Sequence, residues 1–193
     1  MARKQAASQT ADEILGIAQR LVQSRGYNAF SYANISAELG ITKASLHYHF
    51  PSKAELGAKL IARYDQAMLD SLAKISGSAT SPSAMLRQYA NIYSSVLADG
   101  FMCLCGMLAA EFTTLPRAMQ EALDTYFKNN ERWLAGVLAA GREIGELSFE
   151  GEPGEAAQFF VGGLEGAIMM ARAHGGGARF DAARRRLLAE FGA

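Results

Sequence analysis

Two histidines flank a tyrosine in the segment ITKASLHYHF, residues 41–50, one helical turn after a lysine and a serine. Side chains of these types can bind a metal, form a catalytic cluster or contact a polyanion. His47 and His49 are two positions apart. On a helix their side chains diverge by roughly 200°, so they cannot easily hold one ion. No Cys or Asp nearby completes a ligand set, and we expect neither a metal nor a cofactor here.

Helix signals on both sides of this segment determine how its side chains are presented. Ser31 is a candidate N-cap for a short helix over about 32–39, and Gly40 supplies a tight turn. Thr42 can cap a further short helix that runs to about His49. A short helix, a glycine turn and a second short helix are typical of a helix-turn-helix.

The helical period divides the second of these helices into two faces. Leu46 and Phe50 point into a small core, and the opposite, exposed face carries Lys43, Ala44, His47 and Tyr48. An ammonium, an imidazole and hydroxyls on one exposed helix can donate to phosphates and base edges in the major groove of DNA. We expect Thr42 and Lys53, at two helix starts, to hold flanking phosphates. DNA contact is therefore favoured over a solvated helix with incidental histidines.

The rest of the chain also favours helices. Half of the residues are hydrophobic, proline occurs only four times, and alternating strand-like runs are absent, so we expect an all-α fold of about nine helices. A capping box of Thr10 and Glu13 predicts the start of the first helix, and Gly26 its end. Ser52 and Glu55 form a second capping box, which begins a long helix to about Ile75.

Beyond that helix, the segment 76–83 reads as a Gly/Ser/Pro linker. The remaining helices are expected at about 83–98, 104–113, 117–145, 154–174 and 180–190.

Charge and apolar runs narrow the class of protein further. Residues 1–65 carry eight Lys/Arg against five Asp/Glu, a balance of +3, and the remainder carries −3. This asymmetry indicates that the first part meets a polyanion. The first residues lack the apolar core of a secretory signal, and the apolar run over 101–110 is too short to cross a bilayer. We expect a cytoplasmic protein without a membrane partner.

The residues from Thr10 to Ile61, with the glycine turn and the ending YHFPSK, resemble the DNA-binding domain of the TetR family of transcriptional regulators. The resemblance implies a three-helix DNA-binding domain at 1–55, with its helix-turn-helix at 31–50. It also implies a helical effector-binding and dimerisation domain at 56–193.

By this resemblance, individual residues gain expected roles. The positions of Ser31, Tyr32 and Lys53 approach the DNA backbone, those of Lys43, Ser45 and His47 face bases, and those of Tyr48 and His49 face phosphates. The family departs from this chain at two places, because many members have Gly or Pro at Ala44 and Tyr at His47. The implied protein is not an enzyme. It is a homodimer that binds a double-stranded DNA operator, as a repressor released by a small-molecule or electrophile effector, or as an activator.

The penultimate helix carries small residues that would let a partner helix approach. Either it is buried within one chain, or, as the resemblance favours, it forms a two-fold dimer interface. The candidate interface residues are Phe159, Gly162, Gly163, Gly166 and Met170.

Cys103 and Cys105 admit two interpretations. Both can be buried core thiols, or Cys103, at the expected start of a helix, can be a partly exposed thiolate of lowered pKa. The segment CLCGMLAAEF and residues further on are similar to NemR-like repressors, which sense electrophiles through a cysteine. That resemblance implies that Cys103 is the sensing thiol. It also implies that Arg172 belongs to the sensor, at a position where such relatives have a lysine. A small helical thiol enzyme using Cys103 is the rival interpretation.

Aromatic and apolar residues of the second domain could instead line a cavity for a non-covalent effector, or they could be ordinary core. The candidates are Tyr89, Tyr93, Met107, Phe112, Trp133 and Phe160.

Overall fold

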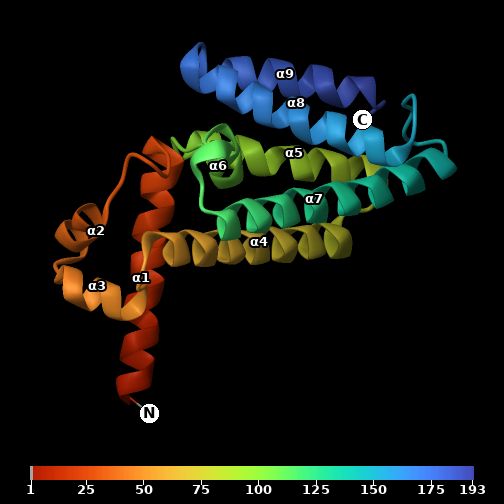
Figure 1. Ribbon diagram of the computed structural model, residues 1–193. Coiled ribbons are helices and arrows are strands. Elements are labelled where there is room, and N and C mark those ends of the chain that lie inside the picture. Colours follow the sequence, from red (N-terminus) through yellow and green to blue (C-terminus); the bar gives the residue numbers. More distant parts are fainter. Residues whose placement is uncertain (1) are drawn as a thin grey trace. The chain divides into compact units, whose positions relative to one another are not determined.

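The computed structural model describes residues 2–193, with side chains from Ser8 onward. Over this range the chain forms nine α-helices and one short 3₁₀ turn, and it contains no strand, which confirms the all-α prediction (Figure 1). The helices are α1 Ala2–Arg25, α2 Tyr32–Leu39, α3 Lys43–His49, α4 Lys53–Ser78, α5 Pro82–Ala98, α6 Leu104–Ala110, α7 Arg117–Glu143, α8 Pro153–Ala173 and α9 Gly176–Glu190, with η1 at Phe112–Thr114.

Two compact units divide the chain, and neither is continuous in sequence. The first comprises residues up to Asp65 together with Leu104–Asp124, and the second comprises Gln66–Cys103 and Thr125–Ala193. The boundary predicted at 55 and 56 therefore does not coincide with the limits of these units, because α4 and α7 each contribute to both. As a division into sequence domains it stays a prediction.

The first unit contains the predicted helix-turn-helix. Gly40 ends α2 in the left-handed region, at φ 70°, and its N–H donates to the Ser36 carbonyl at 3.0 Å. Thr42 caps α3, since its hydroxyl oxygen accepts from the Ser45 N–H at 3.1 Å. Both signals were read from the sequence, and both are confirmed.

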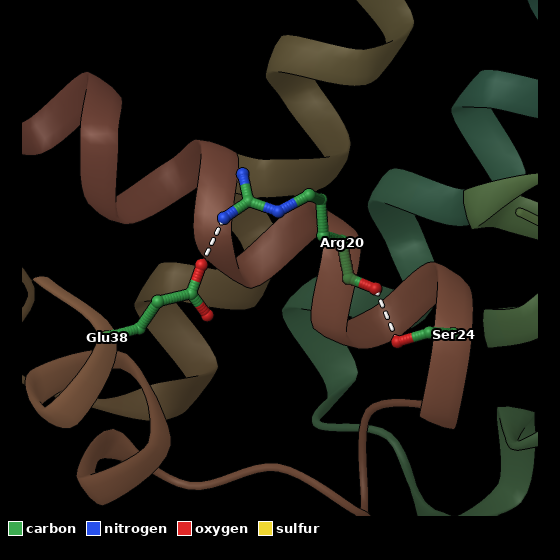
Figure 2. Close-up of polar contacts among 3 residues, drawn as sticks. All are labelled: Arg20, Ser24 and Glu38. Atoms are coloured by element: carbon green, nitrogen blue, oxygen red, sulfur yellow. Dashed lines mark hydrogen bonds and ion pairs between the residues drawn. The ribbon is translucent and has the colours of Figure 1, made fainter. Parts of the chain in front are cut away.

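Apolar burial, rather than surface charge, holds α1, α2 and α3 together. Ile14 and Val22 of α1, Ile35 of α2 and Leu46 of α3 are each completely buried. Figure 2 shows Arg20 of α1 paired with Glu38 of α2, while Ser24 donates to the Arg20 carbonyl at 2.6 Å. An exposed pair of this kind contributes at most about 1 kcal/mol. The core therefore determines how α2 and α3 lie on α1.

The predicted start of the first helix is wrong. Helix α1 begins at Ala2, so Thr10 lies inside it rather than capping it. The residues before Thr10 include Ala, Arg, Lys and Gln, which are strong helix formers, and no Gly or Pro interrupts them. The helix therefore extends past a cap signal. Its predicted end is confirmed, with Gly26 in the left-handed region at φ 88°.

In the second unit α8 and α9 run side by side, and both contact α5 (Figure 1). The linker predicted over 76–83 is mostly helical, because α4 continues to Ser78 and α5 begins at Pro82. Ser76 is held inside α4 by bonds to two partners: it donates to the Leu72 carbonyl and accepts from Trp133 Nε1, each at 3.0 Å. In the described part of the chain no helix combines the length and apolarity needed to span a bilayer.

Candidate nucleic-acid interface and buried thiol site

The outer face of α3 presents the four side chains that the sequence predicted. Lys43, Ala44 and His47 are exposed, and Tyr48 is 81% exposed, more than any other large apolar or aromatic side chain described. Leu46 and Phe50 on the opposite face are 0% and 7% exposed. The Tyr48 ring has the His49 ring as a neighbour, with centroids 5.3 Å apart, and most of its surface faces solvent.

The His47 imidazole is held in one orientation. Its Nδ1 lies 3.0 Å from the Pro51 carbonyl oxygen, and its ring packs on Tyr32 with centroids 4.7 Å apart. A carbonyl oxygen only accepts, so Nδ1 carries the proton of the neutral ring and Nε2 is left as an acceptor. Ser45 and His49 are half-buried, so they present less of their surface than their neighbours do.

Two residues expected to contact the DNA backbone direct their polar groups into the unit instead. The buried Tyr32 donates its hydroxyl to the Phe50 carbonyl at 2.8 Å. The Lys53 ammonium donates to the carbonyls of Tyr27 and Phe30, both at 2.6 Å, and lies over both rings.

Burial lowers the pKa of Lys53, and the nearby Glu111 carboxylate opposes that shift. These contacts tie Lys53 to the loop between α1 and α2, and the phosphate contact expected of it stays a prediction. Ser31, in contrast, is exposed at the N-cap of α2.

A chain of polar groups crosses the interior of the second unit. Tyr89 of α5 donates to Asn130 of α7 at 3.3 Å, and Asn130 donates to the Tyr126 carbonyl at 2.8 Å. The ring of Tyr93 packs against that of Tyr89, with centroids 5.9 Å apart, and its hydroxyl donates to the Glu165 carboxylate of α8 at 3.3 Å. Tyr89, Tyr93 and Tyr126 are each at most 2% exposed.

Cys103 belongs to this polar chain. Its thiol hydrogen-bonds to Glu165, and its Sγ lies 3.9 Å from the Tyr126 hydroxyl. Cys103 is 2% exposed and Cys105 is 0% exposed, so the partial exposure expected of a surface thiolate is not present. Arg172, the expected partner of Cys103, is exposed and lines a groove.

The sequence analysis missed Glu165, Tyr126 and Asn130. One signal for Glu165 was available, because it is the only charged residue in the apolar run from Phe159 to Ala171. Its Oε2 is inaccessible to solvent and has no hydrogen-bond partner. Burial raises the pKa of Glu165 to about 7, and hydrogen bonds from Cys103 and Tyr93 partly offset the shift.

This raised pKa makes the stability of the protein depend on pH. The folded protein holds the Glu165 proton more tightly than the unfolded chain, so the stabilisation is present below about pH 4.5 and is lost as pH rises to about 7. We expect Glu165→Gln, which stays neutral, to match the wild type near about pH 5. At about pH 8 it should be more stable by roughly 3 kcal/mol. Urea denaturation of both proteins at the two pH values measures their free energies of unfolding. The same difference between the two proteins at both pH values would contradict the prediction.

Four of the six candidates for an effector cavity form one cluster of aromatic rings. Tyr89, Tyr93, Trp133 and Phe160 come together in the second unit, where Tyr89 stacks on Trp133 with centroids 5.8 Å apart. Met107 and Phe112 belong to the first unit. The clustered aromatic rings fill space rather than line it, as the core interpretation expected.

The open space described in the second unit lies elsewhere. One groove, of about 590 Å³, is lined by residues that include Phe149, Phe159 and Phe191. The other, of about 630 Å³, is lined by residues that include Ser94, Phe101, Arg172 and Phe180.

Helix α8 keeps an open face. Phe159 is 60% and Met170 48% exposed, Gly162 and Gly166 lie on the same side, and Met169, which the sequence analysis did not select, is 39% exposed. Gly163 differs from its neighbours: a Cβ there would come within 3.0 Å of Leu187 on α9. Gly163 therefore lies against α9 within one chain, and its part in a dimer interface stays a prediction.

Comparison with known proteins assigns the family. Residues 14–60 match the family model "Bacterial regulatory proteins, tetR family". Residues 83–187, more than half of the chain, match "Tetracyclin repressor-like, C-terminal domain". The chain belongs to the TetR family.

Relatives agree with this assignment. Over 77% of its length the TetR-family chain is 32% identical to the transcriptional regulator AcuR of Cereibacter sphaeroides, of which it covers 69%. It is 26% identical to the repressor NemR of Escherichia coli over 84% of both proteins. A TetR-family regulator from Agrobacterium tumefaciens has a solved structure with a TM-score of 0.94. That structure is 36% identical and covers 97% of this chain and 100% of its own.

The chain is thus a DNA-binding transcriptional regulator, and the rival thiol-enzyme interpretation is not favoured. Regulators of this family bind DNA operators, act as dimers and respond to small-molecule effectors.

Proposed function

We propose that this TetR-family regulator is a homodimeric repressor that acts in the cytoplasm and reads its operator through α3. The exposed face of α3 carries the proposal, because Lys43, His47 and Tyr48 stand out from a helix whose opposite face is anchored by Leu46. A helix this short reads few bases, so two copies must read two half-sites about one turn of DNA apart, roughly 34–36 Å.

The proposed contacts fall into two groups. Lys43, Ala44, Ser45 and His47 face base edges, with the small Ala44 allowing close approach. Ser31, Thr42, Tyr48 and His49 hold the phosphates on either side. Tyr32 and Lys53 support this surface from behind, through their bonds to backbone carbonyls.

Lys43→Ala tests the reading face. We expect operator affinity to fall about 5- to 10-fold, since one charged contact with DNA is lost while the fold is unchanged. The slope of log affinity against log salt concentration should also become shallower by about one, since one fewer counterion is released on binding. Lys59→Ala is the matched control, because Lys59 is exposed on α4. A mobility shift on the operator over a salt series measures both variants, and equal losses would contradict the assignment of α3.

The effector acts on the second unit in this proposal. Support comes from the relatives AcuR and NemR, and from a solved structure of NemR in a form named as reduced. We infer a small molecule or an electrophile that modifies Cys103 and lowers operator affinity.

Cys103→Ser should retain operator binding and lose the response to electrophiles. A reporter gene placed behind the operator distinguishes repression from activation.

A further inference from the structure

We infer that Glu165 is the proton acceptor that makes the buried Cys103 thiol reactive toward small, neutral α,β-unsaturated carbonyl compounds. This inference rests on the proposed role of Cys103 as an electrophile sensor. It adds a residue that sequence reasoning did not select, together with the class of reagent that the site accepts.

The geometry is that of an activated nucleophile. Nucleophilic side chains need an adjacent base, and that base is usually oriented by a third group. Here Cys103 hydrogen-bonds to Glu165, and Tyr93 donates to Glu165 Oε1 at 3.3 Å. The Tyr93 ring packs against Tyr89, with centroids 5.9 Å apart, and Tyr89 donates to Asn130 at 3.3 Å. The base is therefore held by Tyr93, which is itself packed among buried groups.

The second carboxylate oxygen is the observation that a purely structural network leaves unexplained. Glu165 Oε2 is inaccessible to solvent and has no hydrogen-bond partner. A buried carboxylate oxygen without a partner costs free energy, and a network kept only for stability would satisfy it. The carboxylate therefore keeps a capacity to accept a proton that its present hydrogen bonds do not use.

Cys103 also lies outside the helices, in a short connecting segment. Residues 101–103 are not helical, and they follow Gly100, which is in the left-handed region at φ 80°. Phe101, two residues before Cys103, lines the groove of about 630 Å³, as does Ser94, the neighbour of Tyr93. A small molecule in this groove is separated from the thiol by a short non-helical segment. A bulky or charged reagent is excluded, because Cys103 is 2% exposed.

The reaction is an addition that needs no oxidant. The Cys103 S–H bond breaks as its proton passes to Glu165, and the sulfur electron pair forms a bond to the β-carbon of the reagent. The π electrons of the C=C bond move to the carbonyl oxygen, which accepts a hydrogen bond from the Tyr126 hydroxyl. The α-carbon then takes the proton back from Glu165, and a neutral thioether remains.

The rate of adduct formation on the full-length protein, followed by mass spectrometry of the intact protein, tests this inference. The probe is methyl vinyl ketone, and Glu165→Gln is the principal variant, since its amide has the same shape but cannot accept a proton. We expect the Cys103 adduct to form about 100-fold more slowly in this variant. Tyr93→Phe, which leaves the base unoriented, should slow the reaction about fivefold. Cys103→Ser should give no adduct, and Cys105→Ser should react like the wild type.

The pH profile separates a chemical role from a structural one. Burial raises the pKa of Glu165 to about 7, so the wild-type rate should rise through that pH and the Gln variant should lose the inflection. The neighbouring ionisable groups are Tyr89 and Tyr93 on α5, Cys103 itself, and Tyr126 and Glu131 on α7. On α9, Arg184 pairs with Asp181 at 3.5 Å. The tyrosines titrate far above this range, so they do not produce the inflection.

Three results would overturn the inference. The first is wild-type reactivity of a folded Glu165→Gln protein, with Tyr93→Phe deciding if that protein does not fold. The second is an adduct that persists in Cys103→Ser. The third is equally rapid labelling by a maleimide attached to a large polyethylene glycol. Operator binding by the unmodified protein is measured in parallel, and its absence would count against the proposed function instead.

Discussion

We expect Gly166→Glu to convert the protein to a monomer and to lower its operator affinity by about three orders of magnitude. Gly166 lies on the open face of α8 with no atom within 4 Å of the position of an added Cβ, so one chain alone accommodates the side chain. In a dimer formed through this face, the two carboxylates would be buried without partners, at a cost of about 3–5 kcal/mol. A monomer reads one half-site and loses most of the specific affinity.

The composition of this face supports the expectation. A glycine in an exposed helix costs about 0.5–1 kcal/mol relative to alanine, so Gly162 and Gly166 are unfavourable unless another helix approaches closely. Phe159, Met169 and Met170 are exposed on the same helix, and together they form an apolar surface of the kind that marks interfaces.

Gly136→Glu is the matched control for this experiment. Gly136 is exposed on α7, again with no atom within 4 Å of an added Cβ, and glutamate is a better helix former than glycine at both sites. Sedimentation velocity gives the oligomeric state, and a mobility shift gives operator affinity. A Gly166→Glu protein that dimerises like the control would show that α8 is not the interface.

We expect His47→Ala to relax the base preference at one position of each half-site. In the neutral ring, the Pro51 carbonyl 3.0 Å from Nδ1 favours the Nδ1–H tautomer, in which Nε2 offers an acceptor to the major groove. The exocyclic amino groups of adenine and cytosine are the donors that such an acceptor reads. We expect a loss of about 1–3 kcal/mol on the natural operator, which is roughly 5- to 150-fold in affinity.

The specificity change is more informative than the loss of affinity. Operators randomised at each position, bound by the wild type and by His47→Ala, show which base pair loses its preference. Every other position should keep its ranking. His174→Ala, at an exposed histidine just after α8, is the control and should leave both affinity and ranking unchanged. Uniform weakening across all sequences would mean that His47 contacts a phosphate rather than a base.

The local features of the DNA-binding part could be predicted from the sequence because they depend on neighbouring residues. Gly26 and Gly40 adopt left-handed conformations that other residues avoid, and Thr42 caps its own helix. The 3.6-residue period separated buried Leu46 from exposed Tyr48. Thr10 shows the limit of such signals, since strong helix formers before it carried α1 through the cap position.

Long side chains were predicted less well than helix faces. Lys53 lies at a helix start, where the sequence suggested a phosphate contact, and yet its ammonium turns to the Tyr27 and Phe30 carbonyls. A flexible side chain takes the nearest strong acceptors, and these come from a loop more than 20 residues earlier in the chain.

The sequence by itself determined the helical architecture, the helix-turn-helix and the outward face of α3, since each is set by residues within a turn or two of one another. Only the tertiary structure decided the site around Cys103. It joins Tyr93 of α5, Tyr126 of α7 and Glu165 of α8 to a thiol in a connecting segment. These residues have no common spacing along the chain. Their proximity arises from tertiary packing, and burial there raises the pKa of the Glu165 carboxyl to about 7.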